Sequence, residues 1–364
     1  MDTLGLLIIL LPLIWPRLLG GLLFQVIPDL TRPGLFFGVT VDPQFRMSKP
    51  AREIRRRYSV WIWVATLIAI AVALTAAFAA AGAGSTPTEE FAALVTHPGL
   101  QRALTAFQAV IALVAFVRAN RETRPHAVSR ASIVQVELST RPPTTTAVFA
   151  VLAVPIASLS ALAVWAVIHW HDLPSRLAVH WAFPEAERWV ATTAFNVIML
   201  FARHTVICLV FVLITWGVLH GSRRIATAGE AALRERRFRV RNVFLLIAVE
   251  YFSVFPVWAA LLGLPSAAMT LWSLIFSATI LVLLARLLLA GQGGTRDLLP
   301  GEGAAGDRTD DRNWSGGVWY FNRTDPAFLV EKRFGIGYTL NFAHPFAWAL
   351  LALIAAMPLI AGML

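Results

Sequence analysis

The fold is decided by residues 189–219, whose sequence is WVATTAFNVIMLFARHTVICLVFVLITWGVL. Arg203 is the only residue of this stretch with a full charge at neutral pH. A helix of about 20 apolar residues crosses the roughly 30 Å hydrocarbon core of a bilayer. Because lipid offers no hydrogen bonds to the backbone, an apolar run of this length predicts a membrane-spanning helix.

Comparable apolar blocks lie on both sides of this stretch. They cover residues 3–27, 59–82, 100–118, 146–169, 242–263, 266–290 and 339–363. The sequence therefore predicts an all-α, polytopic integral membrane protein with about eight transmembrane helices. The count is seven if block 3–27, which contains Pro12, Pro16 and Arg17, does not span.

The composition agrees with this class. Of the 364 residues, 57% are hydrophobic and 14% are charged, whereas a soluble domain has about a quarter of its residues charged. An ordinary cytosolic enzyme and a disordered regulator are therefore excluded. The single cysteine, Cys208, excludes an intrachain disulfide.

Basic residues gather on alternate connections and set the predicted orientation. Segments 28–58, 118–145, 220–241 and 286–338 hold most of the 31 lysines and arginines. By the positive-inside rule these four segments are expected to be cytoplasmic, which places the C-terminus outside. We divide the chain into four regions on this basis: 1–145, 146–219, 220–290 and 291–364.

The basic runs themselves also suggest a ligand. Residues 52–57 and 234–241 are rich in arginine, with little aromatic interleaving for base stacking. We therefore expect them to attract anionic lipid headgroups rather than nucleic acid.

Three ionisable residues stand out deep within predicted spans, where a charge is costly and marks a candidate functional site. These residues are Arg203, His204 and Glu250. Arg203 and Glu250 differ in predicted depth by about 12 Å if both helices stand upright. One interpretation is a charge pair that couples ligand or proton binding, and the other is an interhelical contact that fixes packing.

The predicted external loop after residue 169 contains His169, His171, His180 and Trp181. His180 and Trp181 are candidate ligand-binding residues. The three histidines are weak candidates for zinc, but their spacing matches no recognised ligand set, so we predict no metal site. No motif in the chain indicates a cofactor.

The most patterned predicted cytoplasmic stretch is residues 310–345, which mixes aromatic, glycine and charged residues around a turn. We expect a small amphipathic cap against the membrane or the helix ends, with a partner-docking surface as the alternative. The candidate partner-binding residues are Trp314, Trp319, Tyr320, Asn322, Asp325, Lys332, Arg333 and Asn341.

Two of these stretches carry a family resemblance. Residues 173–181, LPSRLAVHW, followed by EAERW at 185–189, resemble the external-loop signature of a bacterial membrane family of unknown function. That family includes the immunity protein against the sporulation-delaying toxin. The stretch KRFGIGYTLNF at 332–342 resembles a second uncharacterised domain found on similar chains.

The resemblance implies a multi-pass protein of the bacterial inner membrane. Toxin immunity and sequestration of a transcription regulator are known for one relative. We therefore expect a non-enzymatic protein that gives toxin or peptide immunity, or that senses an external peptide and signals to a cytoplasmic regulator protein. The alternative is a secondary transporter that uses Arg203, His204 and Glu250. No sequence motif supports an intramembrane enzyme.

Overall fold

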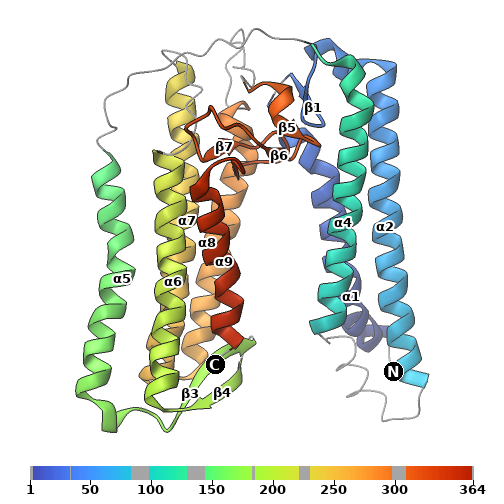
Figure 1. Ribbon diagram of the computed structural model, residues 1–364. Helices are drawn as coiled ribbons and strands as arrows, with labels where there is room; N and C mark the ends of the chain where they lie inside the picture. The colour runs from blue at the N-terminus through green and yellow to red at the C-terminus, as the bar shows by residue number, and fades with distance from the viewer. Residues whose placement is uncertain are drawn as a thin grey trace. The chain divides into compact units, whose positions relative to one another are not determined.

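The computed structural model describes residues 3–32, 34–82, 98–128, 144–182, 185–220, 230–296 and 309–362 (Figure 1). Within these ranges, seven helices are long and apolar enough to cross a membrane. The predicted class, an all-α polytopic membrane protein, is therefore confirmed.

The chain divides into two compact units. The first unit comprises Met1–Ile133, Gly306–Trp319 and Lys332–Ile336. The second unit comprises Val134–Ala305, Tyr320–Glu331 and Gly337–Leu364. Each unit is thus built from segments that lie far apart in the sequence.

The long helices of the first unit are α1 (Thr3–Val26), α2 (Lys49–Gly82) and α4 (Pro98–Thr123). They pack through apolar contacts in which Leu13 of α1 meets Ala69 of α2 and Leu104 of α4. Small residues allow close approach of the backbones. A Cβ atom on Gly21 of α1, for example, would overlap the hydroxyl of Thr66 on α2.

Polar contacts add to this packing. Arg17 of α1 donates to Oγ1 of Thr105 at 2.6 Å and to the carbonyl of Gln101 at 3.2 Å, both on α4. Gln108 of α4 donates back to the carbonyl of Arg17 at 3.1 Å. The charge inside the first helix is thus satisfied by its neighbour, as intramembrane ionisable groups require.

The connection between α1 and α2 folds over the ends of these helices. It contains η1 (Ile27–Leu30), β1 (Leu35–Phe36), β2 (Val39–Thr40) and η2 (Pro43–Met47), and η3 (Arg124–His126) follows α4. Strands β1 and β2 pair antiparallel, and Gly38 in their turn has a φ of 76°. The buried ring of Phe37 contacts Tyr58 of α2 and Phe116 of α4, at ring-centroid distances of 5.0 and 5.5 Å. An aromatic core therefore closes this end of the first unit.

The helices of the second unit are α5 (Thr144–Ile168), α6 (Ala194–Leu219), α7 (Glu230–Leu261), α8 (Ser266–Ala290) and α9 (Pro345–Gly362). Its largest apolar core joins Leu159 and Leu162 of α5 to Leu200 of α6 and Val257 of α7. The charge of the basic run at 234–241 predicts a connecting loop, but in the structure this run lies in the first turns of α7. There Arg239 and Glu235 form a buried ion pair at 2.5 Å, which lowers the cost of continuing the helix through charged residues.

A β-hairpin separates α5 from α6. After η4 (Trp170–Asp172), strands β3 (Arg176–Ala182) and β4 (Glu185–Ala191) pair antiparallel, with Arg176 opposite Ala191 and His180 opposite Arg188. The register shifts on either side of His180, which indicates a bulge at this position.

The last predicted span is shorter than its apolar block. Block 339–363 begins with residues of a strand, and the helix α9 starts at Pro345. Its 18 residues rise about 27 Å as an α-helix. By contrast, the doubtful first block overlaps the candidate span Leu13–Leu30, which is long and apolar enough to cross a membrane.

Short elements precede α9. They are η5 (Gln292–Gly294), η6 (Asp311–Asn313), β5 (Trp314–Ser315), β6 (Trp319–Tyr320), β7 (Leu329–Glu331) and β8 (Tyr338–Leu340). Strands β7 and β8 pair antiparallel in the second unit. Phe328 and Leu329 pack against Gly217 near the C-terminal end of α6, where any side chain larger than glycine's would overlap them. In Figure 1 the strand β7 therefore lies at the opposite end of α6 from the β3–β4 hairpin.

Candidate functional site

The β3–β4 hairpin is fixed to the helices beneath it. Leu177 and Val179 of β3 are buried in the core that contains Leu200 of α6. The guanidinium of Arg203, also on α6, donates to the carbonyl of Val179 at 3.1 Å. The charged residue predicted as a membrane-embedded site thus anchors the hairpin.

The outer face of the hairpin carries solvent-exposed polar and aromatic side chains. Nε2 of His180 lies 3.3 Å from a carboxylate oxygen of Glu187, and these side chains are 64% and 55% exposed. Trp189 on β4 is also exposed. The ring of Trp181 is half-buried, and its Nε1 has no hydrogen-bond partner among the described residues. His180 is therefore accessible to a ligand from this side.

Among the described residues, the histidines of this region belong to no group that could hold a metal ion. Nδ1 of His169 lies 3.1 Å from the carbonyl of Trp165, and the two rings stack. His171 is exposed in η4. In the part of the chain that the structure describes, no three His, Cys, Asp or Glu side chains are grouped closely enough to hold a metal ion.

His204 and Glu250 lie inside the helical core of the second unit, apart from the exposed hairpin face. Nδ1 of His204 makes a 2.7 Å hydrogen bond with the carbonyl of Leu200 one turn earlier. Glu250 is fully buried, and both carboxylate oxygens lack a hydrogen-bond partner among the described residues. Arg203 donates to the carbonyl of Val179 instead, and in the described chain no ion pair joins Arg203 to Glu250.

Several of the predicted partner-binding residues are buried within the second unit. Tyr320 donates its hydroxyl proton to Asp325 at 2.8 Å, and both side chains are buried. Asn341 is fully buried, where its amide donates to the carbonyl of Asn322 at 2.8 Å and its oxygen accepts from the backbone N–H of Asn322 at 3.0 Å. These residues hold the turn at 322–326 in place.

Trp314, Trp319, Lys332 and Arg333 belong to the first unit. Trp319 and Lys332 are half-buried, and burial lowers the pKa of the Lys332 ammonium. Trp314 is buried, and its indole N–H donates to Thr309 at 2.9 Å. The guanidinium of Arg333 lies 5.1 Å above the Trp314 ring, within cation–π range.

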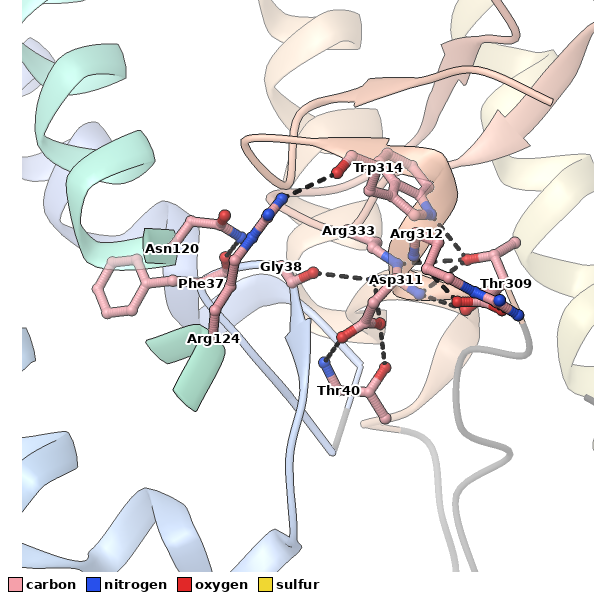
Figure 2. Close-up of polar contacts among 11 residues, drawn as sticks. Phe37, Gly38, Thr40, Asn120, Arg124, Thr309, Asp311, Arg312, Trp314 and Arg333 are labelled. Carbon is pink, nitrogen blue, oxygen red and sulfur yellow. Dashed lines mark hydrogen bonds and ion pairs between the residues drawn. The ribbon is translucent and has the colours of Figure 1, made fainter. Parts of the chain in front are cut away.

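Arg333 is the centre of a buried polar cluster, shown in Figure 2. Its Nη1 donates to Asp311 at 2.6 Å and to the carbonyl of Gly38 at 3.0 Å. Its Nε and Nη2 both contact Thr309. Asp311 in turn accepts from the hydroxyl of Thr40 at 2.7 Å and from its backbone N–H at 3.1 Å. Such complete hydrogen bonding offsets the desolvation cost of a buried charge pair.

The cluster shows what the sequence interpretation missed. Asp311 and Thr40 were not among the candidates, and neither was Asn120, which donates to the carbonyl of Phe37 at 2.8 Å. The turn Gly38-Val39-Thr40 and the acidic pair Asp310-Asp311 are visible in the sequence. No sequence pattern, however, pairs groups that are some 270 residues apart.

Other cationic side chains of the first unit lie near the start of α2. Arg55 pairs with Asp29, and Arg57 pairs with Glu122 at 2.9 Å. Arg52 and Arg56 are exposed. This surface could therefore meet anionic groups from solvent or from a lipid layer.

These features define the class of the protein as an all-α, multi-pass membrane protein with a packed hairpin in one unit and a buried ionic cluster in the other. Residues 323–348, which contain β7, β8 and the start of α9, match a family of unknown function (DUF5808). No curated protein and no solved structure matches the chain. The relationship to the toxin-immunity family therefore stays a prediction.

Proposed function

We propose that this chain is a non-enzymatic protein of the bacterial inner membrane that binds an external peptide at the β3–β4 hairpin and confers immunity or signals its presence. The observation that carries the proposal is the anchored hairpin with an exposed outer face. Leu177 and Val179 fix its inner side, whereas His180, Glu187 and Trp189 are open to solvent. A rigid strand with accessible aromatic and charged groups suits recognition of a peptide.

The distribution of charge supports an external position for this hairpin. The hairpin precedes α6, whereas the basic run at 234–241 follows it, so one membrane crossing separates the two. Under the positive-inside rule the basic connections are cytoplasmic, the hairpin is external and the C-terminus is external. The exposed arginines at the start of α2 then face the anionic lipid headgroups of the inner leaflet.

A cytoplasmic regulator protein would meet the segment before α9. Because Tyr320 and Asn341 are buried, the contact surface in this proposal consists of their exposed neighbours Phe321, Arg323 and Thr324. The buried residues then act as positioning residues that hold this turn in shape.

Expression in a bacterium that is sensitive to the toxic peptide tests the external half of the proposal. We expect His180→Ala to abolish protection, because it removes an exposed side chain without disturbing the anchored face. His171→Ala is a matched control, since it is an exposed histidine of the same connection outside the strands. Full protection by His180→Ala at equal membrane abundance would contradict the proposal.

A secondary transporter is the second candidate function, and Glu250 favours it. A fully buried carboxylate without a protein donor in the described chain can bind a proton during transport. Proton-dependent flux in vesicles that is lost in Glu250→Gln, with His180→Ala unaffected, would support transport. Loss of protection in His180→Ala, with protection kept in Glu250→Gln, would support the sensor or immunity function.

A further inference from the structure

A cavity of about 220 Å³ lies in the first unit next to the end of α4. Its polar wall is formed by Asn120, Arg124, Asp311 and Arg312, beside the ring of Trp314. Figure 2 shows these side chains around the Arg333 cluster. Asn120 and Arg124 are four residues apart at a helix end, so they lie on the same face.

Asn120, one of the residues that line this cavity, carries an unsatisfied acceptor. Its Nδ2 donates to the carbonyl of Phe37 at 2.8 Å, and since a carbonyl can only accept, the orientation of the amide is fixed. Asn120 is 2% exposed, and its Oδ1 has no hydrogen-bond partner among the described residues. A buried acceptor without a donor is costly, so a bound donor would stabilise this site.

Arg124 supplies the positive charge of the wall. The carboxylate of Asp311 is already compensated by Arg333 at 2.6 Å, and Arg312 pairs with Asp310 at 2.6 Å. Arg124 instead donates to the carbonyl of Trp314 at 3.3 Å, and no acidic partner for it lies in the described ranges. Its remaining N–H groups can therefore bind an anion.

We propose that this cavity binds a phosphate group that carries a primary ammonium, as in phosphoethanolamine. Arg124 binds the phosphate, the chemistry for which a guanidinium is best suited. Oδ1 of Asn120 accepts a hydrogen bond from the ammonium. This proposal does not depend on the hairpin or on the proposed function.

The position of the cavity connects this chemistry to lipid. Arg124 lies in the last residues of the apolar stretch Gly99–His126, where a spanning helix reaches the headgroup layer. The ligand can therefore be the headgroup of phosphatidylethanolamine or free phosphoethanolamine. The two sources share the groups that the cavity recognises, and experiment can distinguish them.

Binding to the full chain in a nonionic detergent tests the soluble form. Phosphoethanolamine is expected to bind at least about tenfold more tightly than phosphocholine, because methylation removes the N–H donors and keeps both charges. Nanodiscs of phosphatidylethanolamine or phosphatidylcholine, read by native mass spectrometry for retained lipid, provide the membrane arm. Discrimination in the soluble arm identifies a free ligand, and discrimination in the nanodisc arm alone identifies the lipid.

Arg124→Gln is expected to weaken phosphoethanolamine binding by about tenfold or more. Arg118→Gln is its matched control, because Arg118 is exposed on α4, pairs with Glu122 and does not line the cavity. Asn120→Leu should keep phosphate binding and lose the preference for ethanolamine over choline. Equal binding of the two headgroups by the unaltered chain, equal loss in both arginine variants, or no binding in either arm would overturn the proposal.

Discussion

Replacing Arg333 with methionine should loosen the first unit markedly. Methionine keeps much of the apolar length that packs on Trp314, but it cannot donate to Asp311, Gly38 or Thr309. Removing one partner of a buried ion pair costs about 3–5 kcal/mol. Because the side chain of Asp311 is 33% exposed and can be hydrated, we expect a value near the lower end, about 3 kcal/mol.

Limited proteolysis in detergent micelles measures this loss. When opening is fast compared with cleavage, the cleavage rate follows the population of the open state, and about 3 kcal/mol corresponds to a more than hundredfold faster rate. Chymotrypsin is suitable, since it cleaves at the aromatic residues of the 309–344 segment and does not depend on arginine.

Arg323→Met is the matched control, because Arg323 is exposed in the same segment. In the double variant Arg333→Met/Asp311→Asn the orphaned carboxylate is gone, so the combined cost should be smaller than the sum of the single costs. If Arg333→Met and Arg323→Met were cleaved at similar rates, the buried pair would not stabilise the first unit and our reasoning would be refuted.

Three further changes test the packing of the segment before α9. Gly217→Ala places a Cβ atom in steric overlap with the ring edge of Phe328 and with Leu329, and we expect about 1–3 kcal/mol of destabilisation in the second unit, measured by the same proteolysis. Asn341→Ala leaves buried backbone groups without partners and should cost about 2–3 kcal/mol, whereas Asn322→Ala, at a half-buried position, should cost less. Burial lowers the pKa of Lys332 below its usual 10.5, so the unfolded chain binds more protons between the two values. Stability should therefore rise with pH toward 10.5, and Lys332→Met should remove this rise in pH-dependent unfolding curves.

The membrane helices follow from composition, because a long apolar run has few alternatives in lipid. Block 266–290 coincides with α8, and block 146–169 covers all but the first two residues of α5. The end of the chain is different, since Thr339 and Leu340 open the last apolar block but belong to strand β8. Its pairing with β7 is a tertiary contact that hydropathy does not encode.

The candidate sites were less predictable. An intramembrane charge is recognisable from the sequence, but its partner is not: Arg203 contacts a backbone carbonyl of the hairpin rather than Glu250. Arg333 and Asn341 lie in a conspicuously patterned stretch, yet the pattern does not distinguish a docking surface from an internal framework. The fold buries both side chains, which are 1% and 0% exposed, so they belong to an internal framework.

The interleaving of the two units has a consequence for biosynthesis. The N-terminal helices are complete by Ile133, but the residues that close their aromatic and ionic core begin at Gly306. At about 5–20 residues per second, a ribosome needs on the order of 10–35 s to make the roughly 170 residues between them. Throughout that interval the early helices lack the contact of Gly317 with Gly38 and the bond of Asp311 to Thr40, so the part of the protein made first is finished last. A premature stop codon near position 305 would consequently damage the beginning of the chain as much as its end.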